Sequence, residues 1–319
     1  RIMLVEIRDT DGVIAWGECV AFNTPNYLPE TIDTAWLMIA QHVAPRVLGK
    51  TFATPGEVHP ALEKNFRGHN MAQAATEMTC YALVADNEGI SLSKLLGGTR
   101  TEISSGVSLG IQESPTVLIE KVQRSLEEGY AKVKMKIQPG ADLEYIQAVY
   151  DAVGENAHLM VDANNAYTLS DLDHLLKFDD FGLMMIEQPL AWDDFIRHAQ
   201  LQKKMKTPVC LDESITSIEH AENMVDLDSG RIINIKPGRV GGFHQSVLIH
   251  DFCEKNNIPV WCGGMLESGI GRAHNVALAS KSNFTLPGDL SPSRRYWAQD
   301  IVSPEWDMNK NGMVQVPTE

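Results

Sequence analysis

The sequence predicts an α/β fold, a (β/α)7β TIM-like barrel with an N-terminal α+β capping domain. Beyond residue 100, short apolar segments alternate with amphipathic helical segments, which is typical of a parallel sheet. The polar residues that end successive apolar segments are 26, 25, 25 and 24 positions apart, counted along Lys136, Asp162, Glu187, Asp212 and Lys236. Such regular spacing indicates one strand and one helix per step around a barrel.

The composition is that of an ordinary globular protein. The chain has 319 residues, of which 44% are hydrophobic and 22% charged, and a net charge of −15. These values exclude a disordered chain, and the negative charge disfavours nucleic acid and anionic membranes as partners. Five scattered cysteines and the lack of a long apolar run predict a soluble, cytoplasmic protein. Because Arg1 already lies in a strand-like run, we expect a further segment upstream.

Residues 1–100 form the predicted capping domain. Residues 2–20 alternate apolar and polar side chains about an Asp-Gly pair, which predicts a β-hairpin. Apolar residues at helical spacing then predict three helices, over residues 31–48, 55–66 and 71–87.

Residues 101–290 form the predicted barrel. It has seven apolar strand segments: Ile103–Leu109, Lys132–Ile137, His158–Asp162, Leu183–Glu187, Val209–Asp212, Ile232–Lys236 and Pro259–Cys262. A poorly marked eighth strand is expected near 284–286. Seven strands favour a closed barrel over an open doubly wound sheet, and the sequence contains no GxGxxG or GxxxxGK[ST] motif of nucleotide-binding folds. The irregular segment 291–319 is expected to return to the cap.

The predicted strands end in ionisable residues, in KMK, DAN, IEQP, LDES and IKPG. Taken singly, each charge is well explained as a solvated strand end. Together, Asp162, Glu187 and Asp212 would repel one another at the barrel rim unless a cation held them. With oxygen ligands only and no HxH, HExxH or CxxC motif nearby, the sequence predicts Mg²⁺, with Mn²⁺ as the alternative.

Two lysines end the second and sixth predicted strands, which face each other across a barrel. A carbon held between Lys136 and Lys236 can lose a proton to one lysine and regain it from the other. Positive charge from Lys134 and the metal is expected to lower the pKa of Lys136. Arg239 is expected either to act in the same way on Lys236 or to pair with a carboxylate.

These residues resemble a known family. The KxK, DxN, Glu, DES and KPG elements are similar to those of the muconate-lactonizing branch of the enolase superfamily, whose lysine or histidine bases work with Mg²⁺. The segments GECVAF, GYAKVKMKIQPG, VDANNAY, CLDES, KPGRVGG, WCGGMLESGIGR and FTLPGD resemble its o-succinylbenzoate synthase and N-succinylamino acid racemase group. The resemblance implies Lys136 and Lys236 as acid/base residues, and Asp162, Glu187 and Asp212 as Mg²⁺ ligands.

The resemblance also implies substrate contacts. Lys134 would bind the substrate carboxylate and Asn164 would line the site. The further implied contacts are Ser108, Gly263, Gly264, Met265, Phe22 and Tyr27. A tight bend explains the glycines equally well, and packing explains the aromatic residues. The family's first strand and the mobile loop after it are absent before Arg1.

Two activities are implied for a small-molecule carboxylate substrate. The first is a syn-dehydration that yields o-succinylbenzoate, a menaquinone precursor, and the second is racemisation of N-succinyl or other N-acyl amino acids. One enzyme can carry both. Muconate lactonisation and dipeptide epimerisation are more distant alternatives. A non-catalytic barrel that serves as a binding protein is disfavoured because every metal carboxylate is present. A homo-oligomer is expected.

Overall fold

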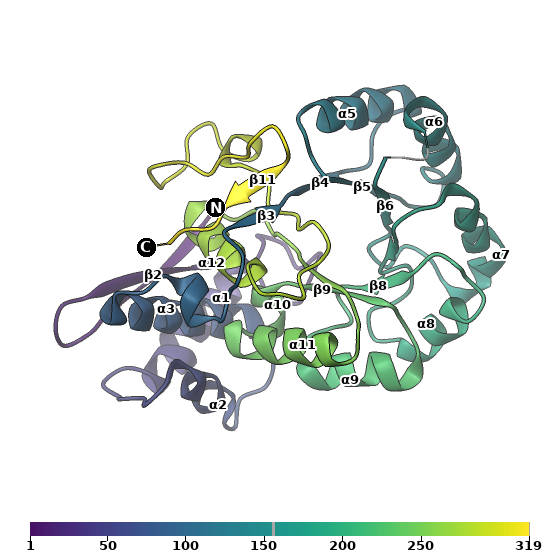
Figure 1. Cartoon of the computed structure of the whole chain (residues 1–319). Helices are drawn as coiled ribbons and strands as arrows, with labels where there is room; N and C mark the ends of the chain where they lie inside the picture. The colour runs from purple at the N-terminus through teal and green to yellow at the C-terminus, as the bar shows by residue number, and fades with distance from the viewer. Residues whose placement is uncertain (155–156, 319) are drawn as a thin grey trace.

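Figure 1 shows the computed structural model of the chain, which describes residues 1–154 and 157–318. The chain begins with an antiparallel hairpin of two strands, β1 (Met3–Arg8) and β2 (Ile14–Cys19). In the turn between them, Asp9 Oδ1 accepts hydrogen bonds from the backbone N–H groups of Asp11 and Val13. The predicted hairpin is therefore confirmed.

The amino-terminal region continues as a series of helices, the longest of which packs against both strands of this hairpin. They are α1 (Ile32–Met38), a π-helical turn (Ile39–Val43), two 3₁₀ turns (Ala44–Arg46 and Pro55–Glu57), α2 (Val58–Glu63), α3 (Asn70–Glu88) and α4 (Leu92–Leu95). The longest helix, α3, lies very close to β2, because a Cβ atom on Gly17 would lie 2.1 Å from Thr79 Oγ1. Glycine at position 17 thus permits the close packing of helix on hairpin.

Seven parallel strands form the main sheet, and their order in space is their order in the sequence. They are β4 (Gly106–Leu109), β5 (Lys132–Lys136), β6 (Leu159–Asp162), β7 (Ile186–Glu187), β8 (Val209–Leu211), β9 (Ile232–Ile235) and β10 (Val260–Cys262). The predicted strand over 103–109 is wrong in one respect. It is divided into β3 (Glu102–Ser104) and β4, because β3 pairs with a different strand.

Helices lie on the outside of the curled sheet (Figure 1). They are α5 (Pro115–Glu127), α6 (Leu143–Val153), α7 (Leu172–Leu175), α8 (Phe195–Gln202), α9 (Ile218–Leu227), α11 (Phe243–Lys255) and α12 (Gly269–Ala279), with 3₁₀ turns at Leu169–Asp171, Leu176–Phe181 and Ser293–Arg295. The short helix α10 (Pro237–Val240) instead packs on α3. A separate buried cluster fills the space enclosed by the curled sheet. It consists of Met160, Met185, Cys210, Ile232 and Trp261. Among the described residues, no helix is long and apolar enough to cross a membrane.

The barrel closes through a short irregular segment. Gly288 N–H donates to the Ser104 carbonyl at 3.1 Å, and Gly106 N–H donates to the Gly288 carbonyl at 2.6 Å. On the other side, Asp289 N–H donates to the Cys262 carbonyl at 3.0 Å. The expected eighth strand near 284–286 does not form as a regular strand. Leu286 N–H donates to the Val260 carbonyl at 3.5 Å, but Pro287 has no N–H group, and Gly288 and Asp289 complete the closure.

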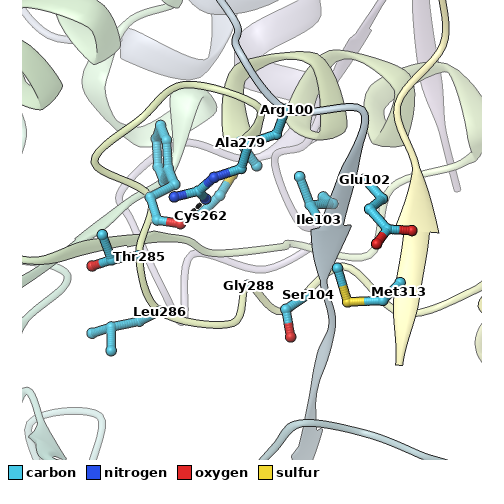
Figure 2. Close-up of a pocket in the computed structure, with 11 residues that line it drawn as sticks. Arg100, Glu102, Ile103, Ser104, Cys262, Ala279, Thr285, Leu286, Gly288 and Met313 are labelled. Atoms are coloured by element: carbon cyan, nitrogen blue, oxygen red, sulfur yellow. Dashed lines mark hydrogen bonds between the residues drawn. The ribbon is translucent and has the colours of Figure 1, made fainter. Parts of the chain in front are cut away.

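The carboxyl-terminal segment lies beside the start of the barrel, where β11 (Met313–Gln315) pairs antiparallel with β3. A cavity of about 220 Å³ lies next to this pair (Figure 2). Its lining includes Ile103 and Met313 from the two strands, Cys262 from β10 and Ala279 from α12. None of the predicted catalytic or metal-ligating residues lines this cavity. The candidate site lies instead at the carboxyl ends of the strands.

Candidate active site

Neighbouring strands bring the predicted charged residues to one end of the barrel. Lys136 at the end of β5 is the register partner of Asp162 at the end of β6, and Asp162 is the partner of Glu187 at the end of β7. Asp212 and Lys236 directly follow β8 and β9. In the observed strand order, the two lysines belong to the second and sixth strands, with the three carboxylates on the strands between them.

Lys134 lies deep in the barrel among three carboxylates. Its Nζ atom is 2.7 Å from Asp289 Oδ2, 3.0 Å from Glu187 Oε2 and 3.4 Å from Asp162 Oδ2. Burial alone would lower the pKa of Lys134, but Asp289, Glu187 and Asp162 hold it well above its usual range. The positive charge of Lys134 is thus paired with carboxylates and is not left free to act on its neighbour Lys136.

Lys136 is the more accessible of the two predicted acid/base residues, with 40% of its side chain exposed. Its Nζ donates to Asn164 Oδ1 at 2.6 Å and lies 4.0 Å from Asp162 Oδ2. Asn164 in turn donates from Nδ2 to Glu213 Oε1 at 3.0 Å. Asn164 therefore lies at the rim and contacts the lysine directly.

Lys236 is buried and firmly anchored. Its Nζ donates to Asp212 Oδ2 at 2.7 Å and to the Tyr27 hydroxyl at 3.1 Å. Tyr27 also donates to Asp212 Oδ1 at 2.8 Å. Burial alone would lower the pKa of Lys236, but Asp212 raises it strongly. Arg239 is buried and ion-paired with Asp212, so of its two expected roles the structure shows the pairing with a carboxylate.

The rim carboxylates form an oxygen-only donor set. Asp162, Glu187 and Asp212 are all buried. Burial next to Asp162 raises the pKa of Glu187 to about 8, although Lys134 opposes this effect. The neighbouring Glu213 Oε2 is buried and has no hydrogen-bond partner in the described part of the chain. Crowded carboxylates with an orphaned oxygen fit a hard divalent cation, which prefers oxygen ligands.

A second group of potential ligands lies on the outside of the barrel, on α11. Ligand atoms of His250, Asp251 and Glu254 lie within 4.8 Å of one another. However, His250 Nε2 accepts a hydrogen bond from Asn283 N–H at 2.9 Å, and Asp251 pairs with Lys281 at 3.3 Å. Protein groups already satisfy this cluster, so the rim is the candidate metal site.

The two glycines after β10 lie against the site. A Cβ atom on Gly263 would lie 2.2 Å from Asn234 Oδ1 and 2.7 Å from Lys236 Cε. A Cβ atom on Gly264 would lie 2.3 Å from the Asp289 carbonyl oxygen. Both positions require glycine because the backbone passes so close to other rim residues.

The remaining predicted contacts lie at different depths. Ser108 on β4 is half-buried and is the register partner of Lys134. Met265 is buried within the apolar cluster of the amino-terminal region. Phe22 belongs to the same cluster, and its ring contacts Tyr27 edge-on with centroids 6.3 Å apart. Of these aromatic residues, Tyr27 reaches the rim charges and Phe22 packs behind it.

Four residues at the site were not identified from the sequence. Asp289 bridges Lys132 and Lys134 at 3.1 and 2.7 Å, and Lys132 lies 3.6 Å from the Trp261 ring centroid. The other two are Asn234, which donates to Glu187, and Glu213, which accepts from Asn164. Alternation along strands would have indicated Lys132 and Asn234, which share a face with Lys134 and Lys236 respectively.

Comparisons with known proteins agree with this geometry. The family model "Mandelate racemase / muconate lactonizing enzyme, N-terminal domain" matches residues 1–97, and "Enolase C-terminal domain-like" matches residues 117–319. An o-succinylbenzoate synthase from Geobacillus kaustophilus is 48% identical over 317 residues, which is 99% of this chain and 84% of that protein. An N-succinylamino acid racemase from Thermus thermophilus is 45% identical, over 96% of this chain and 82% of that protein.

A solved structure shares the whole fold. The crystal structure of an enolase superfamily member from Listeria innocua superposes with a TM-score of 0.95 at 40% identity, covering 100% of this chain and 85% of that one. The predicted resemblance and the predicted capped-barrel fold are confirmed. The chain therefore belongs to the mandelate racemase / muconate lactonizing enzyme family of the enolase superfamily.

Proposed function

We propose that this enzyme removes a proton next to a carboxylate and acts as an o-succinylbenzoate synthase. The observation that carries the proposal is the placement of Lys136 and Lys236 on the second and sixth strands, with three carboxylates on the strands between them. Three relatives named o-succinylbenzoate synthase, at 45 to 48% identity over 99% of this chain, support the reaction.

The proposed cofactor is Mg²⁺, with Mn²⁺ as the alternative. Asp162, Glu187 and Asp212 would hold it, since they supply oxygen ligands and carry the crowded negative charge described above. When bound, the ion would act as a Lewis acid toward the substrate carboxylate. Lys134, next to two of these carboxylates, would contact the same substrate group.

In the proposed dehydration, Lys136 does the proton transfer. Its Nζ takes the proton from the carbon next to the carboxylate and then returns a proton to the departing hydroxide, so that water leaves and a double bond forms. Lys236 keeps its proton and stabilises the negative charge that develops on the substrate. The contacts support this division for the dehydration, because Lys136 is accessible and bonded to a neutral amide, whereas Lys236 is buried and donates to Asp212 and Tyr27.

N-succinylamino acid racemisation is the second candidate. It would use both lysines as proton-transfer groups on opposite faces of one carbon. Relatives with that name, at 44 to 45% identity, favour it. A dipeptide epimerase is more distant at 28% identity. A muconate cycloisomerase shares the fold at 23% identity. A barrel that only binds its ligand is less well supported, because every rim carboxylate and both lysines are present.

Substrate choice is proposed to depend on groups around the rim. Tyr27 contacts Lys236 directly, and Phe22 packs on Tyr27. The other proposed contacts are Ser108, Asn164, Gly263, Gly264 and Met265. Arg239 would modulate Lys236 through their common partner Asp212. A cytoplasmic location and a homo-oligomeric state remain predictions.

A parallel product assay tests the proposal. The purified protein is given Mg²⁺ with either the hydroxylated dehydration substrate of o-succinylbenzoate synthases or an N-succinyl amino acid. We expect dehydration that chelation abolishes and added Mg²⁺ restores. Asp162→Asn should be inactive, whereas Asp173→Asn, an exposed carboxylate on α7, should match the wild type. Racemisation without dehydration would favour the second candidate, and turnover that is indifferent to chelator would overturn the metal assignment.

A further inference from the structure

Two buried glutamates of the amino-terminal region contact the starts of two barrel helices. Glu77 extends from α3 and Glu18 from β2, and both side chains are almost fully buried. Neither contact belongs to the site described above. The two helices, α11 and α12, are those that follow the Lys236 strand end and the Gly263-Gly264-Met265 turn.

Glu77 binds the first turn of α11 with both carboxylate oxygens. Oε2 accepts from Phe243 N–H at 2.7 Å, and Oε1 accepts from His244 N–H at 2.9 Å. Gly242 at the N-cap has φ +123°, and a Cβ atom there would lie 2.2 Å from Glu77 Oε2. The first N–H groups of a helix have no partner within it and attract negative charge. Glycine at position 242 leaves the space that the carboxylate fills.

Glu18 binds the start of α12 in the same manner. Its carboxylate accepts from Ser268 N–H at 3.0 and 3.1 Å, from Ser268 Oγ at 2.5 Å and from Gly271 N–H at 3.0 Å. A Cβ atom on Gly271 would lie 2.9 Å from Glu18 Oε2. Two independent contacts of the same design therefore join the amino-terminal region to the barrel.

The helix starts that the two glutamates contact lie only a few residues after residues of the rim. Only residues 237–242 separate Lys236 from the first residue of α11. Asn70, seven positions before Glu77 and so on the same face of α3, donates to the Arg239 carbonyl at 2.8 Å. Helix α3 thus contacts this connection at Arg239 and the start of α11 directly after it. Ser268 likewise lies three positions after Met265.

We propose that Glu77 and Glu18 are positioning residues that place Lys236 and the Gly263-Gly264-Met265 turn relative to the barrel rim. The proposal rests on the proposed function, in which Lys236 faces the substrate. Glu77 acts through the connection to Lys236 and so affects the chemical step. Glu18 acts through the turn and so affects substrate binding.

The division of roles gives a kinetic test with matched variants. Glu77→Gln keeps the shape of the side chain but replaces one acceptor by a donor, and Glu18→Gln does the same at the second contact. Glu88→Gln, at the exposed end of α3, is the control. We expect Glu77→Gln to lower kcat about tenfold or more with little change in KM. We expect Glu18→Gln to raise KM by a similar factor, while Glu88→Gln leaves both unchanged.

Amide hydrogen exchange provides a readout that needs no turnover. Glu77→Gln should speed exchange in peptides covering 236–244, and Glu18→Gln in peptides covering 263–271, each without affecting the other segment. If both variants lose thermal stability but keep wild-type kcat and KM well below the melting temperature, the glutamates are merely structural and the proposal is overturned. Unchanged exchange in both segments would also overturn it.

Two further results complete the test. If Glu77→Gln does not fold, Glu77→Asp keeps the charge on a shorter side chain and should show the same drop in kcat. If the wild-type protein catalyses neither reaction while the exchange differences appear as expected, the proposed function fails and the placement of the two segments by the glutamates stands.

Discussion

Gly263→Ala tests how tightly the rim is built. The added Cβ atom would lie 2.2 Å from Asn234 Oδ1 and 2.7 Å from Lys236 Cε, whereas ordinary contacts begin at 3.4 Å. Both side chains, or the backbone at position 263, must therefore move by about 1 Å. Asn234 also donates to Glu187 Oε1 at 2.7 Å, so its movement would disturb a proposed metal ligand as well.

A misplacement of this size near reacting groups costs about 10²-fold in rate, and overpacking costs about 1–3 kcal/mol of stability. The assay is steady-state kinetics of dehydration and racemisation together with the melting temperature. Gly110→Ala is the control, because a Cβ atom at that strand end meets no atom within 4 Å. If Gly263→Ala kept wild-type kcat, KM and melting temperature, the close packing of Gly263 against Lys236 would be refuted.

Two further predictions concern single side chains. Asp162→Asn should remove the thermal shift caused by Mg²⁺ while the circular dichroism spectrum stays unchanged; a persistent shift would contradict its role as a ligand. Tyr27→Phe loses a hydrogen bond of 2.8 Å to Asp212, so kcat/KM should fall about tenfold; steady-state kinetics with wild-type values would show that this hydroxyl is dispensable.

The barrel and its charged rim could be predicted because two local patterns carry the information. Strand bodies are apolar and strand ends are ionisable, and the spacing between ends matches one strand–helix unit. Parallel strands bring such ends together whatever the details of packing. This is why the placement of Lys136, Asp162 and Glu187 on adjacent strands followed from the sequence.

The missed residues depend on contacts between distant parts of the chain. Asp289 reaches Lys132 and Lys134 only because the segment around Gly288 closes the barrel through backbone hydrogen bonds to Ser104 and Gly106. That segment has no strand pattern. For Arg239 the sequence left two roles open, acting on Lys236 or pairing with a carboxylate. The residues next to Arg239 in the sequence do not determine which charged group a buried arginine contacts.

Hydrogen exchange at the substrate tests the central claim, that two lysines face one carbon from opposite sides. The enzyme is incubated with Mg²⁺ and each enantiomer of an N-succinyl amino acid in D₂O, and loss of the α-proton is followed by NMR. The wild type should exchange both enantiomers. Lys236→Ala should exchange only the enantiomer whose proton faces Lys136, and Lys136→Ala only the other. Exchange of both enantiomers at comparable rates by Lys236→Ala would contradict the two-sided arrangement.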